Sequence, residues 1–515
     1  MNRDNKSNYK ITLLVGILCI IVILTSTSYA YFKTRIKGDG STISITGGKL
    51  NLVINENKIN LTNVAPIYEN QKDTKASKNE FSINLSNTGV SKACYNIYLD
   101  VDNIGSNLQN RFLKYELTDG TNTYTGNFDG VASGTKIIMV RNESLTSSSS
   151  SKNYTLKLWL QYSESDDQGY ILEGDEASRT FEGKLHITGT TGECKSKTLA
   201  EAMLEDNKVL PDRTNFSTPF TETTTGTLFT STESITGITS TPVNVYYYAG
   251  NTTNNWVKFG EFYWRIIRTN HDGSIRLLYV GTSHDTTTDG IGISSFNTNC
   301  DSPKYVGYKY GEDTSLNTIR NNTTDSTIKT YIDTWYQNNL TNYTKYLSTS
   351  AVYCNDRSEE TEGSYSTSTK FIFASNKRLY TDKTPTYNCS DIKDAFSVEN
   401  TSAQLSYPIA LMTADEIAFA GGVAYAKMST PYAWFMSNSF GTQVSSDWWS
   451  LSPIGWRGGD AFGWFWNSVD AGLDGRYVSD VYVVRPSVSL SSCVKVTGRG
   501  TADDPYQVDE SASTC

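Results

Sequence analysis

Few residues in this sequence combine the types and the spacing that catalysis requires. Ser283-His284-Asp285 contains the three residue types of a hydrolase triad, but sequence neighbours do not form a triad, and no Gly-x-Ser-x-Gly turn surrounds the serine. The chain has only three histidines, and it contains no His-Glu-x-x-His motif and no Cys-x-x-Cys pair. We therefore predict no catalytic site, no metal site and no cofactor, and we expect that the protein is not an enzyme.

A cluster of aromatic residues near the C-terminus indicates binding instead. Six of the ten tryptophans lie between Trp434 and Trp466. Over residues 454–484, glycines are mixed with Tyr, Phe, Arg and Asp, and neither a period of two nor one of 3.6 residues runs through the stretch. Aromatic, Arg and Asp side chains on a Gly-rich backbone are typical of a binding surface. The alternative is a structural loop region with buried aromatics, and a core position is favoured for Trp448 and Trp449.

The residues that frame this stretch resemble a known family. Trp448-Trp449-Ser450-Leu451-Ser452-Pro453 precedes it, and Val484-Arg485-Pro486-Ser487-Val488-Ser489-Leu490 follows it. This frame is similar to the C-terminal module of the variable proteins of diversity-generating retroelements. Tyr246–Gly250, Phe262–Arg268 and Gly500–Tyr506 fit the same module. The resemblance implies an α+β C-type-lectin-like fold and a diversified ligand-binding face, which in this family commonly recognises proteins.

The family also implies which positions vary. Its error-prone reverse transcriptase changes template adenines, mostly in Asn codons, so a varied position never becomes Trp, Lys, Glu, Gln or Met. Residues 454–484 contain no Lys, Glu, Gln or Met, and their tryptophans would be fixed. The ligand-binding positions implied are Arg457, Gly459, Asp460, Phe462, Phe465, Asp470, Asp474, Gly475, Arg476, Ser479, Asp480 and Tyr482. The scaffold positions are Trp448, Trp449, Trp464, Arg485 and Pro486. The Glu-Pro-Asn and Trp-Asn-Asp motifs of calcium-dependent sugar binding are absent.

The N-terminus determines the compartment. Basic residues up to Lys10 precede an apolar run over residues 11–24, and Ser28 and Ala30 fit a small-x-small cleavage site. Residues 1–30 are therefore predicted to be a signal peptide. The alternative is an uncleaved membrane anchor over residues 11–32. In both cases the rest of the chain is extracellular or at the cell surface.

The cysteines fit an exported chain. Seven follow the apolar run, and outside the cytoplasm they can form disulfides. Spacing does not give the pairing, but Cys94 with Cys194 is plausible because both can fall in one domain. The odd number leaves one thiol over, for which Cys515 is a candidate.

An all-β region and a connector precede the lectin-like region. Residues 31–194 show alternating apolar positions, as from Tyr154 to Tyr162, which predict a β-sandwich. Its opening, Ser28–Phe32 and Gly47–Leu52, resembles that of camelysin and TasA-type matrix proteins of Gram-positive bacteria. Residues 195–241 hold one short helix near Leu199 and are then rich in Thr and Ser, which predicts a linker.

Mixed helix and strand signals follow over residues 242–515. Residues 262–268 and 274–280 flank a Gly turn and predict a hairpin. Apolar residues at helical spacing after Asp325 or Ser326 predict a helix, and the capping box of Thr413 with Glu416 predicts another. The expected fold is thus multi-domain, with an all-β sandwich before an α+β domain.

The net charge of the chain limits the classes of partner that it can bind. The net charge is −9 and no run of Lys or Arg occurs, so a nucleic-acid partner is not expected. The favoured hypothesis is a surface-displayed or secreted receptor or adhesin that binds a protein or cell-surface ligand. The alternatives are a structural matrix or fibre protein and, third, an enzyme on a fold like that of formylglycine-generating enzymes. That enzyme needs a reactive cysteine pair, and no cysteine lies between Cys389 and Cys493.

Overall fold

A computed structural model shows a chain that is mostly β-sheet. It describes residues 34–37, 43–44, 50–54, 58–75, 80–87, 91–146, 150–162, 179–360, 365 and 370–513. The predicted signal peptide or anchor, including residues 11–32, lies outside these ranges, as does Cys515. Within them, no helix is long and apolar enough to cross a membrane.

Two facing sheets form the N-terminal part. The first has the order β1-β12-β7-β10, with β4 paired to β12. Its strands are β1 (Thr34–Lys37), β4 (Lys58–Leu61), β7 (Ala93–Ile104), β10 (Thr135–Leu145) and β12 (Phe181–Thr191). The second has the order β2-β3-β6-β11-β8-β9, with β5 beside β11. Its strands are β2 (Ile43–Ser44), β3 (Leu50–Ile54), β5 (Pro66–Ile67), β6 (Glu80–Asn87), β8 (Leu113–Thr118), β9 (Thr123–Asn127) and β11 (Ser150–Gln161).

One core lies between these two sheets. Alternate residues of β8 are buried, beginning with Leu113 and Tyr115, because successive side chains of a strand point to opposite faces. Leu156 and Leu158 of β11 meet Ile97 of the opposite sheet in the same cluster. The Cys94–Cys194 disulfide, the pairing that the sequence made plausible, ties β7 to the segment after β12. Short helical turns are η1 (Glu69–Gln71), α2 (Lys72–Lys75) and η3 (Ser106–Leu108).

The C-terminal part is built on an eleven-stranded sheet. Its strands are β13 (Lys197–Thr198), β14 (Lys208–Leu210), β15 (Thr227–Glu233), β16 (Val243–Tyr247), β17 (Trp256–Phe259), β18 (Phe262–Thr269), β19 (Ile275–Gly281), β26 (Ile409–Leu411), β31 (Pro486–Leu490), β32 (Lys495–Thr497) and β33 (Tyr506–Val508). The hairpin of β18 and β19 is the one that the sequence predicted. Its core continues into the helices and into a second sheet.

That second sheet carries the aromatic segment. It has the order β20-β30-β27-β28-β29, and β24 pairs with β27. The strands are β20 (Ile293–Ser295), β24 (Phe371–Ile372), β27 (Trp448–Arg457), β28 (Asp460–Asn467), β29 (Gly472–Tyr477) and β30 (Val481–Val483). Two smaller pairs are β21 (Lys309–Tyr310) with β22 (Thr324–Asp325), and β23 (Tyr353–Cys354) with β25 (Ala395–Phe396).

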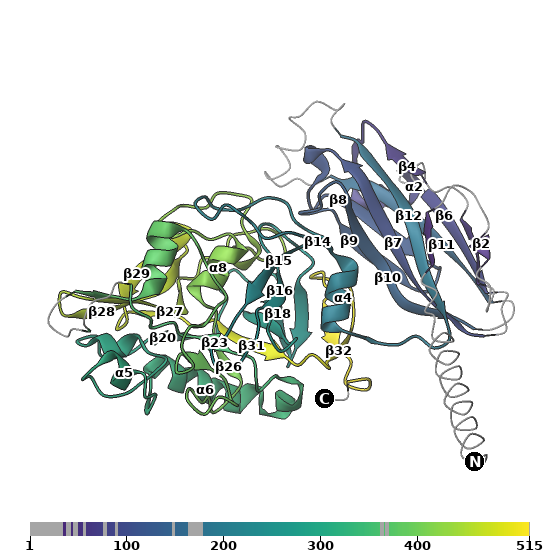
Figure 1. Ribbon diagram of the computed structural model, residues 1–515. Helices are drawn as coiled ribbons and strands as arrows, with labels where there is room; N and C mark the ends of the chain where they lie inside the picture. Colours follow the sequence, from purple (N-terminus) through teal and green to yellow (C-terminus); the bar gives the residue numbers. More distant parts are fainter. Residues whose placement is uncertain are drawn as a thin grey trace, which may run out of the picture.

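Helices cover this part, and two of them begin at caps that the sequence predicts. The helices are α4 (Leu199–Asp206), η6 (Pro303–Val306), α5 (Leu316–Ile319), α6 (Thr327–Asn339), η7 (Thr341–Tyr346), α7 (Ala374–Asn376), η8 (Lys377–Asp382), α8 (Ala414–Ala420) and η9 (Trp434–Met436). The Ser326 hydroxyl caps α6, and Thr413 with Glu416 caps α8. The two main parts lie side by side, with α4 at their junction (Figure 1).

The segment 195–241 is not a linker, which corrects the expectation from its composition. It supplies α4, β14 and β15, and β15 pairs with β14 at its start and with β16 from Phe229 to Glu233. Glu233, at the end of β15, is buried and ion-paired to Arg268 at 2.9 Å. Threonine suits a strand as well as a loop, so composition alone could not distinguish the two.

Candidate functional site

The β27–β28 hairpin shapes the candidate binding surface. Its turn is Gly458-Gly459, with φ of 66° and 95°, between the paired residues Arg457 and Asp460. A two-residue hairpin turn with both φ values positive matches the strand twist and favours glycine. The segment without visible periodicity is therefore a meander of β27, β28 and β29, whose β27–β28 pairing shifts register twice between Trp449 and Gly455.

Buried aromatics support this meander. The five scaffold positions, Trp448, Trp449, Trp464, Arg485 and Pro486, are all buried. The Arg485 guanidinium lies 5.1 Å from the ring centre of Trp448 and donates to the main-chain oxygen of Phe435 at 2.8 Å. Its charge is balanced by Asp289 at 2.6 Å. Arg485 lies between β30 of this sheet and β31 of the eleven-stranded sheet. Its buried contacts therefore hold the two sheets together.

Eleven of the twelve predicted ligand-binding positions are exposed or half-buried. The exception is Phe465, which is 1% exposed, so its assignment as a contact residue is wrong. Its ring stacks on Tyr482 at 4.7 Å and packs near Trp449 at 6.2 Å. The pairing of Phe465 with Trp449 across β27 and β28 places it in the supporting layer.

Six of the twelve positions line one open pocket of about 580 Å³. They are Arg457, Asp460, Phe462, Asp474, Gly475 and Arg476. Arg457 lies over the Phe462 ring at 5.0 Å, and Phe462 contacts Tyr477 with ring centres 4.8 Å apart. The pocket therefore offers aromatic surface with a guanidinium on it, an arrangement that suits contact with another polar surface.

The other six predicted positions do not line this pocket. Tyr482 stacks on the buried Phe465, and Ser479 and Asp480 lie between β29 and β30. Gly459 is in the hairpin turn itself. Asp470 lies beyond the opposite end of β28, where it accepts from the Asn467 amide at 3.0 Å. The eight residues of β28 separate the two ends by roughly 23 Å, so Asp470 does not share the pocket.

Two exposed tyrosines belong to the same surface although the sequence did not suggest them. Tyr425 lines the pocket and is 54% exposed, and Tyr380 contacts it at 5.1 Å and is 53% exposed. Tyr425 also lies 5.8 Å from the buried Trp464. Only the tertiary fold brings them beside β29, where the Tyr425 amide donates to Leu473.

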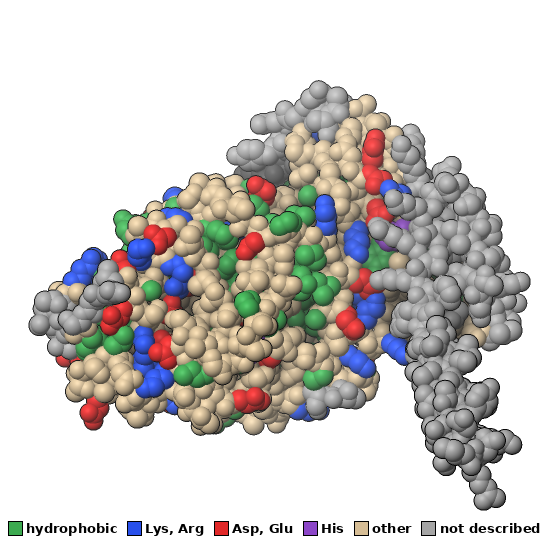
Figure 2. Space-filling view, viewed as in Figure 1, with side chains coloured by type: hydrophobic (Ala, Val, Ile, Leu, Met, Phe, Trp, Pro, Cys, Tyr) green, Lys and Arg blue, Asp and Glu red, His purple; other side chains and the backbone are tan. Residues whose placement is uncertain are grey.

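Charges of both signs are mixed on this surface. Arg476 pairs with Asp474 at 3.3 Å and lies over the Phe465 ring at 5.0 Å. Burial raises the pKa of Asp480 and is opposed by Arg476. Figure 2 shows acidic and basic side chains interspersed at the end of the molecule where β28 lies. Such a surface favours a partner with its own mixed charges over a polyanion.

A free thiol lies beside the hairpin. The Cys300 thiol is 3.1 Å from the Asp460 carboxylate, and burial and that carboxylate raise its pKa. Of the cysteines that the structure describes, Cys300 is the free one, whereas Cys354 pairs with Cys389. A thiol with a raised pKa and no second thiol beside it is not activated as a nucleophile. In the described ranges, no group of three His, Cys, Asp or Glu side chains could hold a metal.

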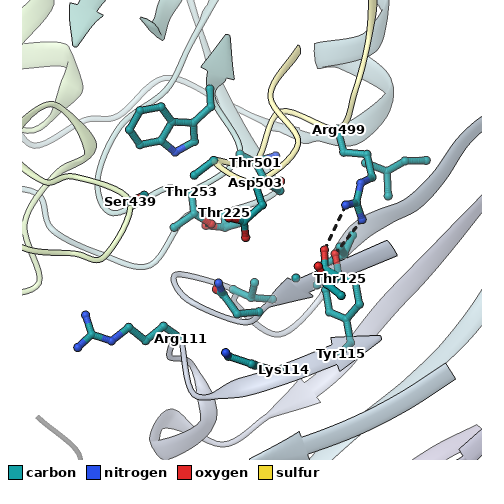
Figure 3. A pocket seen from close by; sticks show the side chains of 18 of the residues that line it. Arg111, Lys114, Tyr115, Thr125, Thr225, Thr253, Ser439, Arg499, Thr501 and Asp503 are labelled. Atoms are coloured by element: carbon teal, nitrogen blue, oxygen red, sulfur yellow. Dashed lines mark hydrogen bonds between the residues drawn. The ribbon is translucent and has the colours of Figure 1, made fainter. Parts of the chain in front are cut away.

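A second cavity, of about 650 Å³, lies between the two main parts of the chain. Arg111 and Lys114 reach it from the N-terminal part, and Thr253 and Asp503 from the C-terminal part (Figure 3). None of the predicted binding positions lines it. Arg499 at its edge bonds to Tyr115 and Thr125, so this polar group serves the contact between the two parts.

Comparison with known proteins does not assign the chain to a family. No protein-family model matches the sequence, and no curated protein matches it.

Proposed function

We propose that the chain is a surface-displayed or secreted receptor of adhesin type that binds a protein or cell-surface ligand through the β27–β29 surface. In this proposal the N-terminal sheets form a β-sandwich like that of camelysin and TasA-type proteins. The C-terminal part is a C-type-lectin-like module of the retroelement-diversified family, and the N-terminal segment exports or anchors the chain. The Cys94–Cys194 and Cys354–Cys389 disulfides fit an oxidising compartment.

One observation carries the proposal. Eleven of the twelve positions proposed to vary are exposed or half-buried in β27 to β30 and the turns between them, with Phe465 as the exception, whereas the tryptophans that Asn codons cannot reach, Trp456, Trp464 and Trp466, are buried beneath this surface. A surface whose variable-type residues are accessible and whose fixed-type residues are buried can change its ligand without losing its fold. A matrix or fibre protein gives no reason for this separation.

Sequencing the locus and its flanks in several isolates tests the proposal. We expect a neighbouring reverse-transcriptase gene and an Asn-rich near-copy of codons 454–484. Substitutions are expected at the eleven accessible positions, with Trp456, Trp464 and Trp466 unchanged. Lys or Glu at these positions in sibling loci, together with no near-copy, would refute diversification.

A binding comparison tests the surface independently of its genetics. Because the natural ligand is unidentified, a library of the full chain randomised at Arg457, Asp474, Arg476 and Tyr482 is displayed and selected against hen lysozyme as the probe. The proposal expects folded, specific binders. A library of equal size at exposed positions of the N-terminal sheets is the control. Equal enrichment from the two libraries argues that the β27–β29 surface has no special capacity for binding.

A further inference from the structure

The C-terminal part has another groove, separate from the β27–β29 surface. It has a volume of about 700 Å³ and lies along α6, against η6 and the segment after β20. Helices α5 and α6 are at the lower edge of the molecule in Figure 1. Cavities that take small ligands have volumes of about 300 to 1,000 Å³. We refer to it as the α6 groove.

The composition of the α6 groove is unusual. Four of its lining residues are aromatic, namely Tyr305, Tyr310, Tyr331 and Trp335, and no aliphatic side chain lines it. The other lining residues are Ser, Thr and Asn, with one Asp. An apolar peptide helix or a lipid tail needs aliphatic contacts, which this groove does not provide.

The four aromatic rings are half-buried, and three of them pack against neighbouring rings. Trp335 packs against Phe262 at 5.3 Å and against Tyr279 at 5.4 Å. Tyr305 and Tyr310 support each other edge to face at 5.3 Å. Because the rings are held by these neighbours, binding on their accessible surfaces loses little side-chain entropy.

Unused hydrogen-bonding groups lie beside these rings. The Asn338 side chain is exposed, and neither it nor the Trp335 indole N–H has a hydrogen-bond partner among the described residues. Thr330 and Thr334 hydroxyls donate to main-chain oxygens of their own helix, which leaves their lone pairs available as acceptors. The groove thus presents donors and acceptors next to aromatic faces.

The one carboxylate that lines the groove is paired with lysines. It belongs to Asp325, the one charged lining residue, and lies 3.2 Å from the Lys329 ammonium and 3.5 Å from that of Lys309. The Lys304 ammonium lies over the rings of Tyr305 and Tyr310 at 5.1 and 5.9 Å but is not a lining residue. The lining residues themselves therefore offer a charged ligand no free counter-charge. The groove matches a neutral molecule that has apolar C–H faces and many hydroxyls.

We propose that the α6 groove binds a neutral oligosaccharide. The C–H faces of pyranose rings pack on Trp335 and the tyrosines, and sugar hydroxyls exchange hydrogen bonds with Asn338 and the threonines. No calcium is needed, because the groove contains a single carboxylate that lysines already pair. This binding is independent of the protein-binding surface on β27–β29.

Titration of the full chain tests this inference. The probes are neutral tetrasaccharides of glucose, mannose, galactose and N-acetylglucosamine, with tetragalacturonate as the charged comparison, followed by calorimetry and tryptophan fluorescence. We expect at least one neutral probe to bind with a Kd below about 1 mM without added calcium. No neutral probe binding in that range, or a preference for tetragalacturonate, overturns the proposal.

Variants locate the binding. Trp335→Ala should weaken it at least tenfold and Asn338→Ala about threefold, in line with the loss of an aromatic contact and of one hydrogen bond. Gln337→Ala, the next residue on α6 but outside the groove, is the matched control and should bind as the wild type does. Asn338 is exposed, so its variant remains informative if Trp335→Ala does not fold. Unchanged binding in Asn338→Ala and in folded Trp335→Ala also overturns the proposal.

Discussion

Arg499 of the C-terminal part donates a hydrogen bond to the Tyr115 hydroxyl in the N-terminal part, with Nη1 and the oxygen 3.2 Å apart. The same guanidinium donates to the Thr125 main-chain oxygen at 3.1 Å. Arg141 extends in the opposite direction, from β10 to the Gly498 main-chain oxygen at 2.9 Å and to the Asp206 carboxylate. Each part therefore buries one arginine of the other. These contacts fix the orientation of the C-terminal part relative to the two N-terminal sheets.

Removal of Arg499 should loosen this contact. Arg499→Ala takes away several buried hydrogen bonds and leaves the Tyr115 hydroxyl and two main-chain oxygens without that partner. We expect the free energy of unfolding to fall by about 2 to 4 kcal/mol, measured by urea unfolding. Hydrogen exchange should increase in β8 and β10. Arg457→Ala, an exposed arginine on the hairpin, is the control and should change stability by less than about 0.5 kcal/mol. Equal stability of the two variants would contradict a role for Arg499 at this contact.

Glu233 makes the free energy of unfolding depend on pH in the acid range. Burial acts to raise the pKa of Glu233, but the Arg268 guanidinium and His271 lower it to about 2. A carboxyl whose pKa is lower in the folded state stabilises the fold above its unfolded pKa, near 4.5, and loses that contribution as the pH falls toward 2. The wild type should lose about 3 kcal/mol over this interval because of Glu233.

Glu233→Gln should remove this part of the acid dependence and be less stable at pH 7, because Arg268 then keeps only Glu416 as a carboxylate partner. Urea unfolding between pH 2 and pH 7 measures both effects. Glu510→Gln, at an exposed position, should keep the wild-type slope. If Glu233→Gln keeps that slope as well, Glu233 is not the titrating group.

Local signals in the sequence located several elements correctly. The caps at Ser326 and Thr413 predicted α6 and α8, because a cap depends on neighbouring residues alone. The alternation from Tyr154 predicted β11, and the Gly turn after Asp272 predicted the hairpin of β18 and β19. These signals need no tertiary information.

Features that depend on distant partners have no local signal in the sequence. β15 lies in a Thr-rich segment, and its strand state depends on pairing with β16 and on the burial of Glu233 against Arg268. Tyr380 and Tyr425 reach the hairpin surface only through the fold. Reachability from an Asn codon predicts Phe465 to be a contact residue, but every residue from Gly463 to Asn467 of β28 is buried, so no alternation in the sequence distinguishes an exposed side chain there. The register of Phe465 against Trp449 explains its burial.

The Cys354–Cys389 disulfide should stabilise the C-terminal part. It closes a chain segment with a sequence separation of 35, for which loop-closure entropy gives about 4 kcal/mol. A Cys354→Ala, Cys389→Ala double variant should unfold at correspondingly lower urea. Cys300→Ser, which removes the free thiol, is the control and should lose far less. Equal losses in the two variants would show that packing at these sites, and not the cross-link, carries the effect.

The division between accessible and buried positions in the meander predicts two classes of variants. Arg476→Ser, Asp474→Asn and Asp480→Asn should each change the free energy of unfolding by less than about 1 kcal/mol, since these side chains are half-buried. Phe465→Ala and Trp464→Ala should each cost about 3 to 5 kcal/mol, because each removes a ring packed among other rings. Thermal and urea unfolding of the five variants measures the difference. Phe465 is the decisive position because an Asn codon can encode Phe there, although the fold buries it. Tolerance of Phe465→Ala would contradict its place in the supporting layer, whereas strong destabilisation by Arg476→Ser would contradict the tolerance that the proposed diversification requires.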